Sequence, residues 1–438
     1  MKITFLGAGS TVFSKNVLGD IMLTPEIKDA EFALYDIDEN RLNESYNMLN
    51  NVLNNTGRKD IVINKYNNLK NALTHADFAI NAIQVGGYEP CTVTDFEIPK
   101  KYGLRQTIAD TLGIGGIFRA LRTIPVMKQF TDVMEEVCPN VLFLNYTNPM
   151  AILSGYVQRH SKIKTVGLCH SVQVCANTLM KNLEMDEYID NTRWEIAGIN
   201  HQAWLLKIED LDGKDLYPEI KKRALEGVSK YPNIKDDLVR LEMMKHFGYY
   251  ITESSEHASE YLPYFIKSKY PELIERFNIP LDEYPRRCIN QIKNWKLTKD
   301  DLVHNKNIEH KKSNEYAANI IKAVISDNPF RIHGNVINTG LITNLPSNAC
   351  VEVPIMVDRN GLNPCYVGNI PEQCAALNRT NINVQLLTIE AANTLKKDFI
   401  YMAAMLDPHT ASELSLDEIR NLCDDLIEAH GDWLPKFI

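Results

Sequence analysis

Short apolar runs and longer amphipathic stretches alternate along the chain up to about residue 210. The amphipathic stretches, such as Glu39–Asn54 and Ile117–Val137, have helical periodicity and are long enough to cross from one strand to the next. Apolar strands that alternate with helices predict an α/β fold, whose parallel sheet is covered on both faces. The expected strands are Lys2–Leu6, Glu31–Tyr35, Ile61–Tyr66, Asp77–Ile83, Asn140–Tyr146 and Lys164–Leu168.

The pattern changes near residue 195, where we expect a second domain to begin. A strand-like pair, Trp194–Ile199 and Ala203–Ile208, precedes a long polar helical region from Ile220 to Ile325. Around Val336–Val357 the sequence is β-rich, and helical sequence follows it, a mixture typical of an α+β domain. We therefore predict one domain at residues 1–194 and a second at 195–438. The active cleft is expected at their junction, outside the carboxyl ends of the strands.

The composition excludes several classes of protein. Of the 438 residues, 45% are hydrophobic and 24% are charged, which is usual for globular proteins and unlike disordered or fibrous chains. The formal charge of −9 argues against a nucleic-acid or anionic-membrane binder, since either needs a basic surface. The longest apolar runs have about ten residues, roughly half of what a membrane-spanning helix needs.

The N-terminus and the cysteines indicate a soluble, cytoplasmic protein. The chain begins with an apolar run that contains Gly7 and Gly9 and has no small-residue cleavage site. We interpret this run as a first strand and not as a signal peptide. The nine cysteines are scattered and show no CxxC spacing. We therefore expect reduced thiols rather than a disulfide framework.

A glycine-rich turn directly follows the first expected strand. In Gly7-Ala-Gly9-Ser10 the glycines allow a close backbone approach, so a pyrophosphate can sit at the N-terminus of the following helix. Asp36 closes the second strand, where a carboxylate accepts hydrogen bonds from a ribose diol and repels a 2′-phosphate, which favours NAD over NADP. Val12 stands in place of the usual third glycine. Gly86, after the fourth strand, supports a dinucleotide site; the alternative is an α/β fold whose turn glycines hold no ligand.

Three further polar clusters follow expected strand ends. They are Asn-Tyr-Thr-Asn148-Pro149, Cys169-His170-Ser-Val-Gln173 and Gly198-Ile-Asn200-His201. A thiolate and an imidazole that converge on one point suit a borderline divalent metal, whose open positions a substrate can fill. On spacing alone, Cys169 can equally be a small buried hydrophobe and His201 a core histidine.

Together these motifs resemble glycoside hydrolase family four, the NAD- and metal-dependent glycosidases, and most closely its branch that acts on α-galactosides. The resemblance extends over nearly the whole chain. It also covers Asp110-Thr-Leu-Gly-Ile-Gly-Gly-Ile-Phe-Arg-Ala-Leu-Arg-Thr-Ile-Pro125, Gly248-Tyr-Tyr-Ile-Thr-Glu-Ser-Ser-Glu-His257, Asn344-Leu-Pro and Val351-Glu-Val-Pro354. It implies a Rossmann-type fold related to lactate and malate dehydrogenases. The first domain would bind NAD, and the second would serve catalysis, substrate binding and oligomerisation, in a homodimer or homotetramer.

The resemblance also implies roles for the residues at the strand ends. Cys169 and His201 would hold the metal, usually manganese, and Asn148 and Asn200 would bind the sugar. The residue after the metal cysteine is the proposed acid in several members, where it is often Asp. Here it is His170, as in the branches that act on galactosides and glucuronides.

The implied base is a tyrosine, which we match to Tyr249, with Tyr250 as the alternative. In the implied reaction, NAD⁺ takes a hydride from C3 of the sugar, the base removes the C2 proton, and the metal stabilises the enediolate. Elimination then expels the aglycone, water adds to C1, and the hydride returns to C3. The expected activity is hydrolysis of terminal α-galactosides of the melibiose or raffinose type, so the partner is a small oligosaccharide.

Other functions stay open at this point. Within the family, the alternatives are an α-glucosidase and an α-glucuronidase, while the motifs around the predicted site bring acidic groups and no arginine, which disfavours a sugar phosphate. A 2-hydroxy-acid dehydrogenase could use Arg119 and Arg122 for its substrate carboxylate, but its His-Gly would be the distant His333-Gly334. A non-catalytic NAD sensor would keep the glycine turn without needing the Cys169, His201 and Asn148 set.

Overall fold

One twelve-stranded mixed sheet runs through the whole molecule. The structure is a computed structural model and describes residues 1–438. Its parallel half has the strand order β3-β2-β1-β4-β5-β6, which is the order of a Rossmann fold. These strands are β1 (Lys2–Leu6), β2 (Ala30–Tyr35), β3 (Ile61–Tyr66), β4 (Phe78–Asn81), β5 (Leu142–Asn145) and β6 (Lys164–Gly167). The predicted α/β fold with a Rossmann-type parallel sheet is confirmed.

Antiparallel strands continue the sheet into the second half of the chain. β10 joins β6 where Asn335 lies opposite Gly167, and β11 joins β7 where Glu352 lies opposite Gly198. The strands are β7 (Thr192–Ile199), β8 (Gln202–Asp210), β9 (Tyr250–Ile251), β10 (Phe330–Ile337), β11 (Cys350–Asp358) and β12 (Gly361–Pro364). The domain boundary predicted near residue 195 falls within β7, and the sheet is continuous across it.

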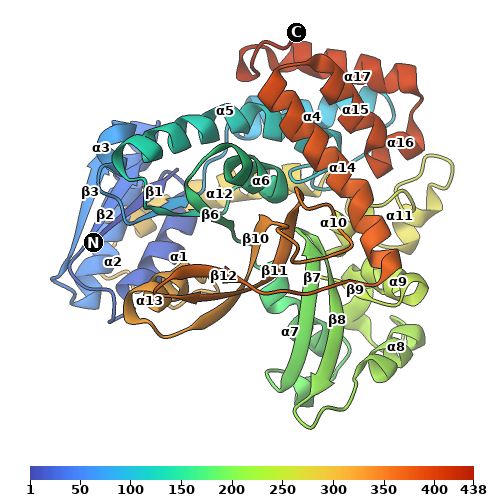
Figure 1. Cartoon of the computed structure of the whole chain (residues 1–438), viewed down its shortest axis with the longest axis horizontal. Helices are drawn as coiled ribbons and strands as arrows, with labels where there is room; N and C mark the ends of the chain where they lie inside the picture. The colour runs from blue at the N-terminus through green and yellow to red at the C-terminus, as the bar shows by residue number, and fades with distance from the viewer.

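Alternate side chains of the parallel strands face two separate cores. Phe5 of β1 packs on the side of α1 and α2, whereas the next residue, Leu6, packs on the side of α5 and α6. Figure 1 shows these two helix pairs on opposite faces of the parallel strands. The helices of this half are α1 (Thr11–Met22), α2 (Glu39–Thr56), α3 (Leu69–Leu73), α4 (Val93–Lys101), α5 (Gly113–Val137), α6 (Met150–His160) and α7 (Ser171–Asn182).

The helical region expected from Ile220 to Ile325 is broken into shorter elements. Gly248 ends α9 at a φ of +90°, a left-handed conformation that favours glycine, and the chain then pairs with β8 as β9. The helices are α8 (Tyr217–Glu226), α9 (Leu238–Phe247), α10 (Ser255–Glu260), α11 (Glu272–Arg276), α12 (Glu283–His304) and α13 (Ala317–Ser326). The C-terminal helices are α14 (Glu372–Thr394), α15 (Lys397–Leu406), α16 (Pro408–Glu413) and α17 (Leu416–His430).

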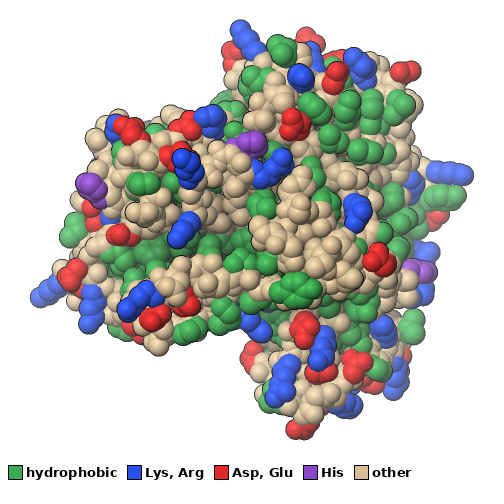
Figure 2. Space-filling model, in the orientation of Figure 1, with side chains coloured by type: hydrophobic (Ala, Val, Ile, Leu, Met, Phe, Trp, Pro, Cys, Tyr) green, Lys and Arg blue, Asp and Glu red, His purple; other side chains and the backbone are tan.

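Charged side chains of both signs are interspersed over the face of the molecule drawn in Figure 2. The acidic excess of the chain is therefore not gathered into one field on this face. None of the helices is both long enough and apolar enough to span a bilayer.

Candidate active site

A thiol, an imidazole and a carboxylate converge near the end of β6. Cys169 follows β6, His201 lies in the turn between β7 and β8, and Glu253 follows β9. One ligand atom from each of the three residues lies within 4.8 Å of the others, and Nε2 of His201 is 3.5 Å from Oε2 of Glu253. The structure thus brings the predicted Cys169 and His201 together. It adds Glu253, to which the sequence analysis assigned no role.

The electrostatics of this cluster favour a bound cation. Burial, together with the carboxylates of Glu352 and Glu253, raises the pKa of the Cys169 thiol. Burial also opposes ionisation of Glu253, but the rings of His201 and His257 lower the pKa of this carboxyl to about 2. A divalent ion would favour the thiolate, which is the form of cysteine that binds metals. Thiol, imidazole and carboxylate donors together suit a borderline divalent metal.

Buried polar atoms without protein partners surround the cluster. They include Nδ1 of His201 and Oδ1 of Asn148, whereas the Asn200 amide approaches the carboxylate of Glu352 and lowers its pKa. Nδ2 of Asn148 makes a long hydrogen bond of 3.5 Å to Oδ2 of Asp110. Buried polar groups normally find partners, so the unpartnered atoms are suited to a polar ligand such as a metal with a bound sugar. The two asparagines predicted to bind substrate therefore lie in a suitable environment.

The tyrosine that the structure brings to the cluster is Tyr261, which the sequence analysis did not select. Its ring centroid is 6.4 Å from that of His201, and its hydroxyl is buried without a hydrogen-bond partner. Burial, with the nearby Asp110, Glu253 and Cys169, raises the pKa of Tyr261 well above its ordinary value. A phenol in this place needs a neighbouring cation before it can act as a base.

The two tyrosines predicted as the base are used elsewhere in the fold. The ring of Tyr249 packs edge-on against Tyr217, with 6.0 Å between centroids. Tyr250 is fully buried, and its hydroxyl donates to Asp237 while the guanidinium of Arg240 lies 4.6 Å from its ring centroid. Their placement follows from β9, whose pairing with β8 directs the Tyr250 side chain into the core. The structure thus places the ring of Tyr261 beside His201, while Tyr249 and Tyr250 make the contacts described here.

His170 lies beside the cluster, at the N-terminal end of α7. Its Nε2 atom is 2.8 Å from Oε1 of Glu315, and its ring lies between those of Tyr146 and Tyr316, at centroid distances of 6.5 and 6.4 Å. The hydrogen bond to Glu315 outweighs burial and raises the pKa of His170 above its ordinary value. The side chain is 42% exposed, so a ligand can reach it.

The glycine turn after β1 has a shape that other residues would disturb. Gly7 has a φ of +85°, and a Cβ there would lie 2.8 Å from the carbonyl oxygen of Ala82. The N–H of Gly9 donates to Oδ2 of Asp36 at 2.7 Å, and the Ser10 hydroxyl donates to the carbonyl of Gly7 at 2.8 Å. A hydrogen bond therefore holds the Asp36 carboxylate beside the glycine turn, where the predicted dinucleotide site places it.

The loop that contains Gly86 is held by a buried ion pair. Nε of Arg122 donates to the carbonyl of Val85 at 3.2 Å, and its two amino groups bind the carboxylate of Asp95 at 3.1 and 2.6 Å. Nε2 of His430, at the end of α17, also lies 2.9 Å from Asp95. Gly86 itself adopts a φ of +79°, so the close approach of this loop depends on glycine.

Both arginines considered for a hydroxy-acid site have partners in the protein. All three guanidinium nitrogens of Arg122 are used, as described above. Arg119 does approach the site, contrary to the expectation of no arginine there. Its Nε donates to the carbonyl of Asn148 at 3.3 Å, and a terminal nitrogen donates to the hydroxyl of Tyr284 at 3.0 Å. Arg122 is therefore committed to the loop and to Asp95, whereas the second terminal nitrogen of Arg119 makes no hydrogen bond to the protein.

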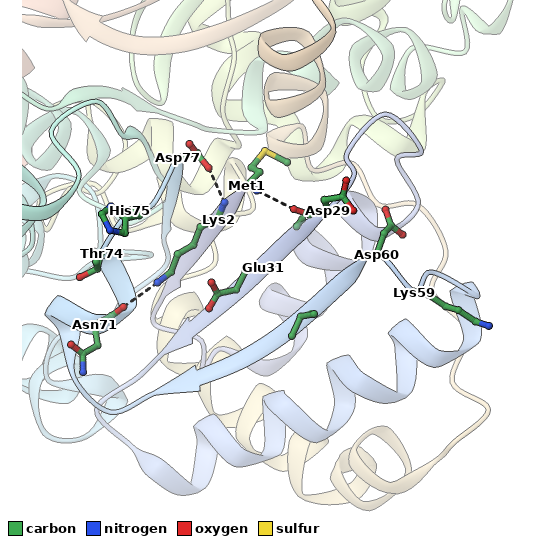
Figure 3. A pocket seen from close by; sticks show the side chains of 12 residues that line it. Met1, Lys2, Asp29, Glu31, Lys59, Asp60, Asn71, Thr74, His75 and Asp77 are labelled. Atoms are coloured by element: carbon green, nitrogen blue, oxygen red, sulfur yellow. Dashed lines mark hydrogen bonds between the residues drawn. The ribbon is translucent and has the colours of Figure 1, made fainter.

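A cavity of about 810 Å³ lies at the opposite end of the parallel strands. Figure 3 shows its lining, in which the amino group of Met1 donates to the carbonyl of Asp29 and the Lys2 ammonium donates to that of Asn71. Because Lys2 and Ala30, the first residues of β1 and β2, line this cavity, it is at the amino edge of the sheet. Ligands of open α/β sheets bind at the carboxyl edge, so the cavity is distinct from the predicted cofactor site.

The chain matches known proteins over its whole length. A model described as family 4 glycosyl hydrolase matches residues 2–185, and one described as the C-terminal domain of that family matches residues 196–410. An alpha-galactosidase of Bacillus subtilis (strain 168) is 60% identical over 436 residues, covering 100% of this chain and 99% of that protein.

Solved structures share the fold at lower sequence identity. A 6-phospho-beta glucosidase from Thermotoga maritima, solved with manganese, NAD⁺ and glucose-6-phosphate, superposes with a TM-score of 0.80 at 20% identity, covering 100% of both chains. Malate dehydrogenase from Plasmodium falciparum superposes with a TM-score of 0.54 at 13% identity, covering 91% of this chain and 99% of that one. The predicted relationship to the dehydrogenase fold is confirmed.

Proposed function

The chain belongs to the family 4 glycosyl hydrolases and is a glycosidase; from this premise we propose that it hydrolyses terminal α-galactosides of the melibiose or raffinose type. The observation that carries the substrate assignment is the 60% identity to an alpha-galactosidase over the full length of both proteins. The convergence of Cys169, His201 and Glu253 beside unpartnered polar atoms supports a metal-dependent reaction at this place.

We propose that NAD and a divalent metal, such as Mn²⁺, are the cofactors. Gly7, Gly9, Ser10 and Asp36 form a cradle that fits a dinucleotide, and the cluster offers three donors that fit a divalent ion. The Thermotoga maritima relative was solved with the same two cofactors. When bound, NAD⁺ supplies a hydride acceptor for C3 of the sugar, and the ion supplies a Lewis acid whose charge also favours thiolate and phenolate forms nearby.

The protein groups around the cluster would then act on the sugar. Asn148 has an unpartnered amide oxygen that can hydrogen-bond its hydroxyls, and Asn200, beside Glu352, would offer a second amide. Tyr261, whose hydroxyl is unpartnered beside His201, would remove the C2 proton. His170 would donate a proton to the departing oxygen, since it is reachable from solvent and hydrogen-bonded to Glu315. General acid–base groups of this kind typically contribute about 10²- to 10⁴-fold to the rate.

The remaining assignments rest on the arrangement of the fold. We propose that residues 1–194 hold the dinucleotide and that residues 195–438 complete the substrate site and carry the contacts of a homodimer or homotetramer. Nine free cysteines, one of them in the metal cluster, support a cytoplasmic, reducing location.

An assay matrix tests the substrate and the cofactors together. The substrates are p-nitrophenyl α-galactoside, α-glucoside, α-glucuronide and their 6-phosphates where these exist, each with and without Mn²⁺, NAD⁺ and a thiol. We expect turnover of the galactoside only when all three additions are present, without net formation of NADH. Full activity after EDTA treatment and removal of nucleotide would refute the cofactor assignment, and preference for another sugar would refute the substrate.

A variant of the third ligand tests the metal site without relying on turnover. Glu253→Gln removes the charge but keeps the size, so we expect weaker binding of Mn²⁺ in a direct titration. Glu309→Gln makes the same change at an exposed position and serves as the control. Equal Mn²⁺ affinity in the two variants would exclude Glu253 from the site.

A further inference from the structure

Residues 305–316, which connect α12 and α13, run along α2 and α1 of the Rossmann half and then reach the active site. Nδ2 of Asn55 in α2 donates to the carbonyl of Ile308 at 3.0 Å. Asp20 of α1 then accepts from Nε2 of His310 at 2.7 Å and from the N–H of Ser313 at 2.9 Å. His310 and Asp20 have side chains that are almost fully buried. These contacts fix the connection on α1 and α2 before it reaches the site.

The last two residues of the connection contact the site directly. Glu315 is buried, and its Oε1 lies 2.8 Å from Nε2 of His170, while its Oε2 is buried without a partner. The hydroxyl of Tyr316 donates to the backbone carbonyl of Cys169 at 2.9 Å. The carboxylate of Glu315 therefore belongs to the surroundings of His170, although more than 140 residues separate them in the sequence. The proposed function invokes this carboxylate only as a hydrogen-bond partner of His170 and gives it no role of its own.

We propose that Glu315 is the positioning residue for His170, and this inference rests on the proposed function. The imidazole is 42% exposed and, without an acceptor, its ring is free to rotate. By accepting the Nε2–H, Glu315 fixes the ring orientation and the tautomer of the neutral ring, which leaves Nδ1 as the nitrogen available to a substrate. A carboxylate that orients a histidine in this way recurs in catalytic and metal sites of many folds.

The proton balance of this arrangement closes over one turnover. When the C1–O bond breaks, its electron pair stays on the aglycone oxygen, which takes the proton from Nδ1 of His170. The ring is then neutral and still donates Nε2–H to Glu315. When water adds to C1, its proton passes to Nδ1, which restores the starting state. The inference therefore requires no oxidant, reductant or co-reactant beyond those of the proposed reaction.

The position of Glu315 is suited to orientation and not only to holding the connection in place. The anchors on α1 and α2 involve other side chains, so removing the carboxylate leaves them intact. Glu309 is the other acid of the same connection; it is exposed and provides a matched control. Replacing Glu315 by Leu removes the acceptor at similar size, whereas Gln restores one acceptor oxygen without the charge.

The test compares Glu315→Leu, Glu315→Gln and Glu309→Leu on melibiose and on aryl α-galactosides whose phenols differ in pKa. A poor leaving group needs the proton, so we expect Glu315→Leu to lower kcat on melibiose about 100-fold, within the usual range for an acid catalyst. The loss on p-nitrophenyl α-galactoside should be below about tenfold, with KM little changed. Glu315→Gln should recover part of the loss, and Glu309→Leu should match the wild type.

Two further readouts distinguish orientation from a general structural effect. His170→Ala and the double variant His170→Ala/Glu315→Leu should have the same kcat, because both residues act through one imidazole. In ¹⁵N spectra recorded at a pH where the ring is neutral, the signals of His170 should show a proton on Nε2 in the wild type and lose this preference in Glu315→Leu. Equal losses on melibiose and the activated galactoside, or an unchanged His170 tautomer, would overturn the inference.

The ¹⁵N spectra distinguish a failure of the Glu315–His170 inference from a failure of the proposed function. If the wild type cleaved no α-galactoside, the proposed substrate would be wrong. The Glu315–His170 inference would then be decided by the ¹⁵N signals alone. Unchanged NAD⁺ affinity in Glu315→Leu serves as the check that the variant is folded.

Discussion

Replacing Gly9 by alanine should weaken NAD⁺ binding through displacement of Asp36. A Cβ at this position would lie 2.7 Å from Oδ2 of Asp36 and 3.0 Å from Cβ of Arg41. Both distances are well below van der Waals contact, so the carboxylate has to move. Its 2.7 Å hydrogen bond from the Gly9 N–H is then lost. Asp36 is then no longer held where it can accept from the ribose hydroxyls. One hydrogen bond to a charged group is worth about 1.5–3 kcal/mol, which corresponds to roughly ten- to hundredfold weaker binding.

Calorimetric titration of NAD⁺ into four proteins measures this effect. Wild type and Asp38→Asn should bind alike, because Asp38 carries the neighbouring charge but caps α2, accepting from the N–H of Asn40. Gly9→Ala and Asp36→Asn should both bind more weakly, and Asp36→Asn should also lose its discrimination against NADP⁺. Tight NAD⁺ binding by both Gly9→Ala and Asp36→Asn would mean that the ribose lies elsewhere, and the cofactor site would have to be redrawn.

Three other outcomes follow from the buried groups. Because the Cys169 thiol has a raised pKa and must ionise to bind a metal, Mn²⁺ binding at pH 7 should release one proton from Cys169 in addition to any from Glu352, and Cys169→Ser should lower the release by about one; calorimetry in buffers of different ionisation enthalpy measures it. Tyr261→Phe should suppress deuterium uptake at C2 of galactose released in D₂O, whereas Tyr249→Phe should retain it, and the reverse result would restore Tyr249 as the base. Asp95→Ala leaves the buried guanidinium of Arg122 unpaired, so the free energy of unfolding in urea should fall by about 3–5 kcal/mol, and a loss below 1 kcal/mol would count against that pair.

The parallel half of the fold could be predicted because its signals are local. Each strand is a short apolar run, and the family resemblance implied the Rossmann-type arrangement of these strands. Gly7, Gly9 and Asp36 could be identified in the same way, since they stand at strand ends with a fixed relation to the sheet. The break of the region after Ile220 was missed, because the decisive event is the left-handed turn at Gly248 rather than a change in composition.

The site residues differ in how far the sequence could indicate them. Glu253, His257 and Tyr261 recur at intervals of four residues, but only His257 lies within the short helix α10, with the other two on either side of it. The recurrence is visible in the sequence, whereas the approach of Tyr261 to His201 depends on how the fold places α10 beside the turn between β7 and β8. Glu315 offers no such signal, because its contact with His170 depends on a loop whose course is set by tertiary anchors.

The charges of the buried side chains in the site favour a bound cation. Glu352, fully buried on β11, has its pKa raised by burial to about 7, although His201 and Asn335 partly offset this. Cys169 likewise has a raised pKa, whereas the pKa of Glu253 is lowered, against burial, by His201 and His257, by the backbone N–H of Ser254 and by Arg240. The pocket thus contains more acidic groups than its own cations can stabilise, and burying unpaired charges is costly. A divalent cation held by the cluster would remove this imbalance, lower these pKa values together and give the unpartnered polar atoms around it a ligated sugar to bind.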